Sequence, residues 1–409
     1  MSDPLFRWNP HLVKPEVLDY LAKHQNSDPK QRAFRSSPFD EVTRIELQQQ
    51  WEGRDRICKK LPSWYKNKQA LFPARLNLEQ CSSEKTADYK AALIQSKLKK
   101  QKAILADITG GFGVDSFAFA KQGFQVHYCE RQSDLAQLVA YNSMAFGLDD
   151  FHTYAQEAEA FFLQSKINFD LVYADPARRD EEQNRVFALE QTEPNLKSLL
   201  SFLPSRTPYL LLKTSPFLDI QQGLNALPNA TEVHVVAIGK EVKELLWWVP
   251  LNEEKSQPQI ICAHYANDQW KETRFSYGDI AVAESIFGEP EGYLYVPNPS
   301  LMKSGAFDWI SQEFGVKKIQ KNSHLYSSPL RLDFPGKRFT ILDTLSPTSK
   351  QLKKYKNQKW EVVSRNYPSR VEEIRQQFRI KAGGKSDYLF FTRNQQDQAL
   401  LIEARLDQD

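Results

Sequence analysis

The sequence predicts an α/β protein built on a doubly wound, largely parallel sheet. Three observations support this fold class: a glycine-rich turn between a buried strand and a helix, an acidic residue at the end of the next strand, and further apolar strands that follow in order. A helical region precedes the predicted sheet, and a small α+β domain follows it.

The first strand and its glycine turn are the most informative part of the chain. Residues 104–108 are apolar except for Asp107, as is typical of a strand covered on both faces. Gly110, Gly111 and Gly113 follow, and glycines allow a sharp turn and the close approach of the backbone to a ligand. The next residues predict a packed helix whose N-terminus faces that ligand.

The second predicted strand, residues 124–129, ends at Glu130. An acidic side chain about 20 residues past the glycines is placed to accept hydrogen bonds from ribose hydroxyls. Glu130 could also be an ordinary solvated carboxylate, but the glycine turn favours the ribose contact.

The position of Asp107 distinguishes between classes of nucleotide. A dinucleotide fingerprint has a third glycine where this chain has Ser116. Asp107 ends the first strand, where a carboxylate repels pyrophosphate and attracts a cation such as an amine or a sulfonium. The segment from Asp107 to Gly113 resembles the first motif of class I S-adenosylmethionine-dependent methyltransferases, and NAD is not expected to bind.

The resemblance continues in order along the chain. After a third strand at 151–154, Glu157 lies where these enzymes contact the adenine ring. A fourth strand at 169–174 leads into Asp175-Pro-Ala-Arg178, at the position of the motif that lines the methyl-transfer site. Strands at 209–213, 230–246 and 259–263 complete a predicted seven-stranded, Rossmann-like methyltransferase sheet.

The resemblance implies S-adenosylmethionine as the cofactor. Asp107 would orient its methionine portion and Glu130 would hold its ribose. The full set of expected cofactor contacts is Asp107, Thr109, Gly110, Gly111, Gly113, Glu130, Arg131, Glu157 and Asp175. The segment before the first strand, residues 82–90, is expected to form a helix capped by Ser82 or Ser83, with Gln80, Ser83 or Lys90 either contacting the methionine end or serving only in packing.

Three residues are expected to act on the acceptor. Asp175 would contact it as a hydrogen-bond acceptor or a base, and Lys213 would lie at the same edge of the sheet. Arg178, or its neighbour Arg179, could bind a substrate phosphate, although either could instead pair with a nearby carboxylate.

The fourth motif also limits the reaction. Enzymes that methylate exocyclic amines of bases typically have a second proline and a stacking aromatic residue there, whereas this chain has Ala177 and Arg178. Adenine-N6 and guanine-N2 methylation are therefore disfavoured. No cysteine lies near the fourth or fifth strand end, so direct in-line displacement is expected rather than a covalent enzyme–base adduct.

Composition predicts a cytoplasmic protein without a membrane anchor or a metal. The start of the chain is polar, and no apolar run is long enough to cross a bilayer. The four cysteines are scattered, at positions 58, 81, 129 and 262, which disfavours a zinc site or a disulfide framework.

Charge is unevenly distributed along the 409 residues. Residues 1–102 contain 20 Lys and Arg against 12 Asp and Glu, residues 103–330 contain 18 against 29, and residues 331–409 contain 16 against 10. Basic flanks around an acidic middle suit a polyanionic partner, although such runs are also typical of solvated helix faces.

Four regions are predicted: a helical region at 1–90, a methyltransferase domain at 91–270, a connector or substrate-side segment at 271–330, and an α+β domain at 331–409. The last has strands near 339–342, 360–363 and 388–391 and a helix at 371–378. Together with the motifs at 78–90, 109–115, 175–179 and 297–303, this order resembles a bacterial group of methyltransferases of similar length that carry a C-terminal THUMP-like domain. Related THUMP domains bind structured RNA, so the resemblance implies an RNA partner for the basic terminal regions.

Three functions remain open at this point. The favoured one is an RNA methyltransferase. The alternatives are a methyltransferase of a small molecule or protein, and a non-catalytic RNA-binding protein that keeps a vestigial methyltransferase fold.

Overall fold

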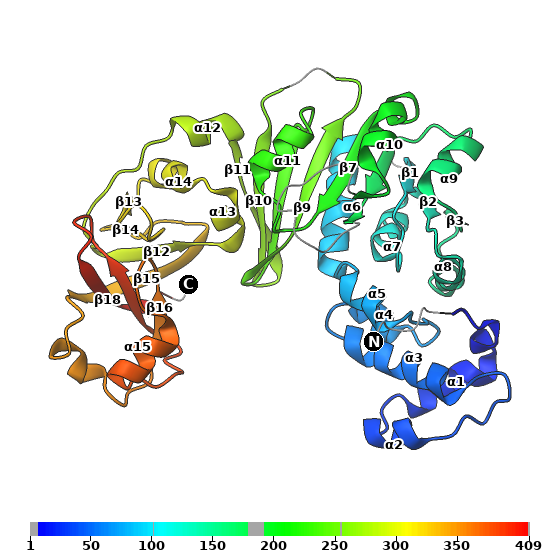
Figure 1. Ribbon diagram of the computed structural model, residues 1–409, viewed down its shortest axis with the longest axis horizontal. Helices are drawn as coiled ribbons and strands as arrows, with labels where there is room; N and C mark the ends of the chain where they lie inside the picture. The colour runs from blue at the N-terminus through cyan, green and yellow to red at the C-terminus, as the bar shows by residue number, and fades with distance from the viewer. Residues whose placement is uncertain (1–6, 101, 179–191, 254–255, 408–409) are drawn as a thin grey trace. The chain divides into compact units, whose positions relative to one another are not determined.

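The computed structural model describes residues 7–100, 102–178, 192–253 and 256–407 (Figure 1). These residues form two compact units. Unit 1 comprises the described residues within Met1–Ala230 and Trp247–Lys255, and unit 2 those within Thr231–Leu246 and Ser256–Asp409. No helix in the described part of the chain is both long and apolar enough to cross a membrane.

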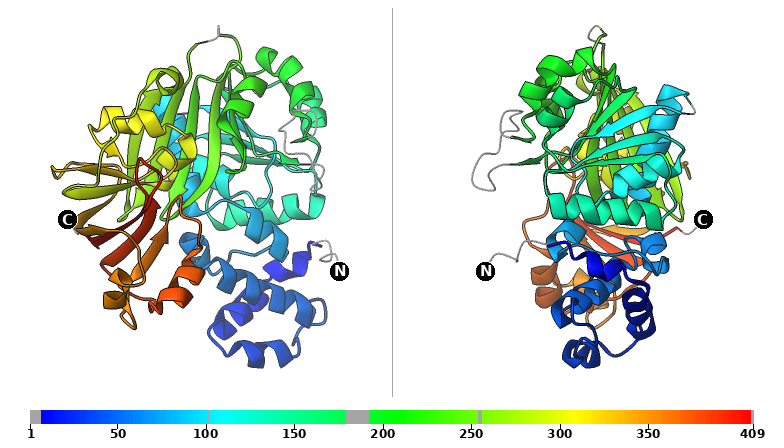
Figure 2. Two further views of the ribbon diagram at one scale, coloured as in Figure 1. Left: turned by 60° about the vertical axis from the view of Figure 1, so that its left-hand side comes forward. Right: turned by 90° about the vertical axis from the view of Figure 1, so that its right-hand side faces the viewer.

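The N-terminal part of unit 1 is helical, as predicted. Its helices α1 to α5 lie together at one end of the unit (Figure 2). Thr43 and Glu46 form a capping box at the start of α3, and the Ser83 side chain caps α6 by accepting a hydrogen bond from the Thr86 amide. The elements are η1 (Pro10–Val13), α1 (Pro15–His24), α2 (Pro29–Phe34), α3 (Arg44–Ile57), α4 (Pro62–Lys66), α5 (Arg75–Gln80) and α6 (Glu84–Leu98).

The sheet of unit 1 contains five parallel strands in the order β3-β2-β1-β4-β7. These strands are β1 (Ile104–Asp107), β2 (Gln125–Cys129), β3 (Phe151–Tyr154), β4 (Leu171–Ala174) and β7 (Tyr209–Thr214). The helices between and after them are α7 (Val114–Lys121), α8 (Ser133–Ala145), α9 (Ala158–Gln164), α10 (Leu196–Phe202) and α11 (Ile220–Ala226), with η3 (Leu203–Ser205). This order confirms the predicted doubly wound sheet.

The chain reverses direction across this sheet at β1. From β1 it steps to β2 and β3 on one side, then returns to β4 and β7 on the other. Side chains at the carboxyl ends of β1, β2 and β4 therefore surround a crevice, the usual place for a ligand in such a sheet. A short ladder of β5 (Ala177–Arg178) and β6 (Thr192–Glu193) follows β4.

The predicted sixth strand, residues 230–246, is two strands in the structure. β8 (Glu232–Ile238) is followed by Gly239, whose φ of +60° lies in the left-handed region, and β9 (Glu241–Pro250) begins two residues after this glycine. β9 starts within unit 2 and ends within unit 1.

Unit 2 contains β8 paired in parallel with β10 (Gln259–Ala266), the predicted seventh strand, which turns back into β11 (Gln269–Ser276). Asn267 and Asp268 form this turn with positive φ angles, as a tight hairpin requires. Helix α12 (Tyr277–Val282) follows.

A seven-stranded sheet completes unit 2, in the order β13-β14-β12-β15-β18-β17-β16. Its strands are β12 (Tyr293–Pro297), β13 (Lys317–Lys318), β14 (Tyr326–Ser328), β15 (Gly336–Leu345), β16 (Glu361–Ser364), β17 (Asp387–Arg393) and β18 (Ala399–Leu406). Its helices are α13 (Pro299–Ser304), α14 (Phe307–Glu313), η4 (Gln351–Tyr355) and α15 (Val371–Phe378). Leu294 on β12 and Phe339 on β15 are register partners and pack in one core cluster, so residues 293–297 belong to the same sheet as the C-terminal strands.

Candidate active site

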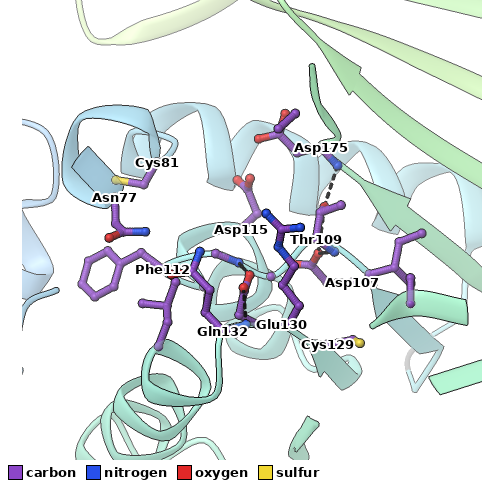
Figure 3. A pocket seen from close by; sticks show the side chains of 18 of the residues that line it. Asn77, Cys81, Asp107, Thr109, Phe112, Asp115, Cys129, Glu130, Gln132 and Asp175 are labelled. Atoms are coloured by element: carbon purple, nitrogen blue, oxygen red, sulfur yellow. Dashed lines mark hydrogen bonds between the residues drawn. The ribbon is translucent and has the colours of Figure 1, made fainter. Parts of the chain in front are cut away.

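A cleft opens at the carboxyl ends of β1, β2 and β4, within unit 1 (Figure 3). Asp107 ends β1, Glu130 follows β2 and Asp175 follows β4, so the parallel sheet brings together three acidic residues that are far apart in sequence. Helix α5 and the turn that follows it supply another wall, through Asn77, Gln80, Cys81 and Ser82.

The glycine turn has two distinct structural reasons for its glycines. Gly111 and Gly113 have φ angles of +52° and +79°, and Gly113 is the residue from which α7 starts. A Cβ on Gly110 would lie 2.1 Å from the Tyr128 ring. The Tyr128 ring therefore fills the space that a side chain at Gly110 would need. The sequence predicted that the glycine allows the backbone to approach a ligand, and did not predict this packing against Tyr128.

Asp107 directs its carboxylate into its own turn. Its Oδ1 accepts a hydrogen bond from the Thr109 amide (3.1 Å), and its Oδ2 accepts one from the Ser116 hydroxyl (2.6 Å). Burial raises the pKa of Asp107 to about 7, although these two hydrogen bonds act in the opposite direction. Ser116, which stands where a dinucleotide fingerprint has glycine, thus ties the first turn of α7 to the end of β1.

Thr109 connects this turn to the fourth strand. Its hydroxyl oxygen accepts a hydrogen bond of 2.6 Å from the Asp175 amide, shown as a dashed line in Figure 3. The predicted cofactor residue Thr109 and the predicted acceptor residue Asp175 are therefore in direct contact.

Glu130 is held by the backbone at both carboxylate oxygens. Oε2 accepts a hydrogen bond from the Gly111 amide and Oε1 one from the Gln132 amide, each at 2.9 Å. A carboxylate oxygen can accept more than one hydrogen bond, so this orientation leaves acceptor capacity for ligand hydroxyls.

Asp115, on the first turn of α7, is the main residue of the cleft that the sequence analysis missed. Lys90 of α6, whose side chain is fully buried, places its Nζ 3.2 Å from Oδ1 of Asp115. Oδ2 accepts hydrogen bonds from the Ser82 and Tyr173 hydroxyls, both at 2.8 Å. Burial alone would raise the pKa of Asp115, but the charges of Lys90 and Lys213 and the two hydroxyl hydrogen bonds hold it below its ordinary value.

The sequence contained one signal for Asp115: it is the single charged residue in the otherwise uncharged stretch from Phe112 to Ala120. Of the residues expected near the methionine end, Gln80 lines the cleft, Ser83 caps α6 and Lys90 pairs with Asp115.

Lys213 and Asp175 form an ion pair. The parallel register of β4 and β7 pairs Ala174 with Leu212, which places the next residue of each strand side by side. The structure thus brings together two of the three residues predicted to act on the acceptor.

The third, Arg178, lies in β5, where its backbone pairs with Thr192 of β6. The Arg178 side chain and Arg179 lie outside the described residues. Arg131 forms an ion pair with Glu193 of β6, and both line the cleft, as does Glu157.

The cleft is strongly acidic. Among the residues that the structure describes, six acidic side chains line it, from Asp107, Asp115, Glu130, Glu157, Asp175 and Glu193, against one guanidinium, from Arg131. Three of these carboxylates pair with a cation: Asp115 with Lys90, Asp175 with Lys213 and Glu193 with Arg131. Of the other three, Asp107 is buried in its own turn, so Glu130 and Glu157 are the carboxylates placed to favour a positively charged ligand over a polyphosphate. The described residues include no group of acidic, histidine or cysteine side chains able to hold a metal ion.

Comparisons with known proteins agree with this architecture. A ferredoxin-like domain model matches residues 293–335, and a THUMP domain-like model matches residues 336–405. A crystal structure of a candidate methyltransferase from Porphyromonas gingivalis W83 is similar to this chain along its whole length, with 26% identity, coverage of 98% of this chain and 100% of that chain, and a TM-score of 0.88.

Two RNA methyltransferase structures match far less well. The 16S rRNA N2 methyltransferase of T. thermophilus, solved with AdoMet and guanosine, is 14% identical with a TM-score of 0.31, covering 40% of this chain and 42% of that chain. A candidate RNA methyltransferase from Pyrococcus horikoshii is 14% identical with a TM-score of 0.26, covering 35% of this chain and 63% of that chain. The comparison with curated proteins gives no match.

The full-length structural match and the C-terminal domain model confirm the resemblance that the sequence motifs predicted, to the bacterial group in which a class I methyltransferase fold is followed by a THUMP-like domain.

Proposed function

We propose that this protein is an S-adenosylmethionine-dependent methyltransferase that methylates RNA by direct in-line displacement. The observation that carries the proposal is the acidic cleft at the carboxyl ends of β1, β2 and β4, built around a glycine turn. The carboxylates of this cleft suit a sulfonium cofactor that carries a ribose and an amino group, because carboxylates attract cations and accept hydrogen bonds from hydroxyls.

Individual residues would divide the binding of this cofactor. Glu130 would hold the ribose hydroxyls, Glu157 would contact the adenine, and Arg131 would lie beside them. Gly110, Gly111, Gly113 and Thr109 shape the turn against which the cofactor would lie. Asp107 would not contact the methionine portion directly, because its carboxylate is buried in its own turn. It would instead fix the conformation of the turn against which the methionine portion lies.

The cofactor, when bound, supplies an electrophilic methyl group. The chain's own part is to align the acceptor with that group, and alignment can contribute several kcal/mol, of the order of 7–11 in ideal intramolecular reactions. Asp175 would accept a hydrogen bond from the acceptor, and its ion pair with Lys213 fixes the carboxylate at the edge of the cleft. Arg178 would bind a phosphate of the substrate.

RNA is the acceptor that the THUMP domain-like match at residues 336–405 supports, and the charge distribution is compatible with it. The regions 1–102 and 331–409 are basic, whereas residues 103–330 are acidic, as expected when the middle of the chain binds a cationic cofactor and the flanks bind a polyanion. The protein would act in the cytoplasm, without metal.

Isothermal titration with S-adenosylmethionine tests the cofactor site. We expect micromolar binding by the wild type and a loss of at least tenfold in Glu130→Gln, which removes the charge and also one of the two oxygens that accept from the Gly111 and Gln132 amides. Glu16→Gln, an exposed carboxylate of α1 outside the cleft, is the matched control and should bind as the wild type does. Absence of binding at millimolar cofactor, with or without RNA, would overturn the proposal.

Transfer of a tritiated methyl group to total bacterial RNA tests the acceptor. Label that disappears on treatment with ribonuclease supports RNA. Label that resists ribonuclease but is removed by protease, or that stays in the small-molecule fraction, would establish one of the alternative methyltransferases instead.

A further inference from the structure

Phe217 is an exposed aromatic residue in the turn between β7 and α11, with 91% of its surface accessible to solvent. The turn itself is well anchored. The Phe217 amide donates to the Ser215 hydroxyl (3.3 Å), and the Leu218 amide donates to the Ser215 carbonyl (3.1 Å). Leu218 is buried, and the Asp219 side chain caps α11. The backbone is therefore held on both sides of Phe217 while its ring faces solvent.

This turn follows β7, the strand next to the one that leads into Asp175. β4 and β7 are parallel neighbours, and Lys213 of β7 forms an ion pair with Asp175. β7 ends at Thr214, so the turn leaves the sheet at the same carboxyl edge as Asp175. Phe217 is four residues beyond Lys213 in the chain.

An exposed aromatic ring such as that of Phe217 can bind a planar acceptor by stacking. Nucleic-acid bases stack on aromatic side chains, and this contact holds a base in place without reading its identity. The segment directly after β4, Asp175-Pro-Ala-Arg178, has no aromatic side chain to provide that surface. The turn after the neighbouring strand does provide one, at the same edge of the sheet.

We propose that Phe217 is a specificity-determining residue whose ring stacks on the nucleobase that accepts the methyl group, while Asp175 accepts a hydrogen bond from the edge of that base. The inference rests on the proposed function, because it takes the acceptor to be a base of RNA. It adds the residue that would select a planar acceptor and hold it beside Asp175.

Four variants test the inference. Phe217→Ala removes the ring, Phe217→Leu keeps an apolar side chain without an aromatic face, and Phe217→Tyr keeps the face. Phe34→Ala is the matched control, because Phe34 is also highly exposed (84%) but belongs to α2 of the N-terminal helical region, not to a turn that follows a strand of the sheet. For each, kcat/KM for methyl transfer to total bacterial RNA and the dissociation constant of S-adenosylmethionine are measured.

We expect Phe217→Ala to lower kcat/KM for RNA by about 5- to 150-fold, the range that loss of one base–aromatic stack produces. Phe217→Leu should fall with it, whereas Phe217→Tyr and Phe34→Ala should stay within about twofold of the wild type by the same measure. Cofactor affinity should be unchanged in all four.

The inference would be overturned if Phe217→Ala were as active on RNA as the wild type. It would also be overturned if Phe217→Tyr lost as much activity as Phe217→Ala, or if the loss in Phe217→Ala were matched by an equal loss of affinity for S-adenosylmethionine. Failure of the proposed function looks different, because the wild type itself would then transfer no methyl group to RNA. In that case the role of Phe217 falls with it.

Discussion

Replacing Lys90 by methionine would remove the cation that pairs with the buried Asp115 carboxylate and leave only the more distant charge of Lys213. The Lys90 side chain is fully buried and its Nζ lies 3.2 Å from Oδ1 of Asp115. Removing one partner of a buried ion pair typically lowers the free energy of unfolding by about 3–5 kcal/mol. Methionine fills much of the space of the lysine stem, so the cavity contribution is small. The hydrogen bonds from Ser82 and Tyr173 remain, which places the expected loss near the lower limit, about 3 kcal/mol.

The loss should depend on pH in a defined direction. The pKa of Asp115 is held below its ordinary value, so the stability that its ionised form contributes is present above the unfolded pKa of 3.8 and disappears as pH falls through the folded pKa. The effect of Lys90→Met should therefore be largest near neutral pH and shrink below about pH 4.

Urea unfolding, with amide hydrogen exchange of α6 and α7 as a local readout of unit 1, measures this effect. Lys85→Met, an exposed position on the same helix, is the matched control and should change stability by no more than about 0.5 kcal/mol. Adding Asp115→Asn to Lys90→Met removes the uncompensated charge and should recover part of the loss. If Lys90→Met unfolds within 1 kcal/mol of the wild type by this measure, or if the double variant shows simple additivity, the buried pair does not act as described.

Two further predictions concern the glycine turn. Because burial raises the pKa of Asp107 to about 7, the folded state keeps a proton that the unfolded state loses above 3.8, and stability should fall as pH rises from about 4 to 7, by about 4 kcal/mol in total. Subtracting the urea-unfolding profile of Asp107→Asn from that of the wild type isolates this slope, and equal profiles would contradict it. Gly110→Ala should cost about 1–3 kcal/mol, because its Cβ would lie 2.1 Å from the Tyr128 ring. Thermal unfolding measures the cost, and Tyr128→Leu in the same chain should relieve it; an equally stable Gly110→Ala would contradict the packing role.

The features that sequence predicted best are those encoded locally. The glycine turn, Glu130 at the end of β2, the cap at Ser83 and helix α15 at Val371–Phe378 all depend on residues within one turn or one strand. The adjacency of Asp175 and Lys213 could also be predicted from the sequence, because the parallel strands of such a sheet bring their carboxyl ends to one edge.

What sequence did not predict depends on contacts between distant segments. Lys90 and Asp115 are 25 residues apart on different helices, and nothing in the local pattern shows that each is buried against the other. The same holds for Gly110, whose requirement for glycine comes from the Tyr128 ring rather than from a ligand. The split of residues 230–246 into β8 and β9 was missed because both halves are apolar enough to be strands, and one glycine separates them.

The course of β9 has a consequence for how the chain can be divided. Residues up to Leu246 belong to unit 2 and those from Trp247 to unit 1, so the backbone passes from one unit to the other at three points. No single cut yields one complete unit on each fragment, whether it is made by a protease, by a gene fusion or by recombination between genes. A breakpoint near residue 231 would move the end of β9 away from unit 1, and a breakpoint near residue 256 would separate β8 from its parallel partner β10, so exchange of the C-terminal domains between relatives is expected to need compatible sequences on both sides of either breakpoint.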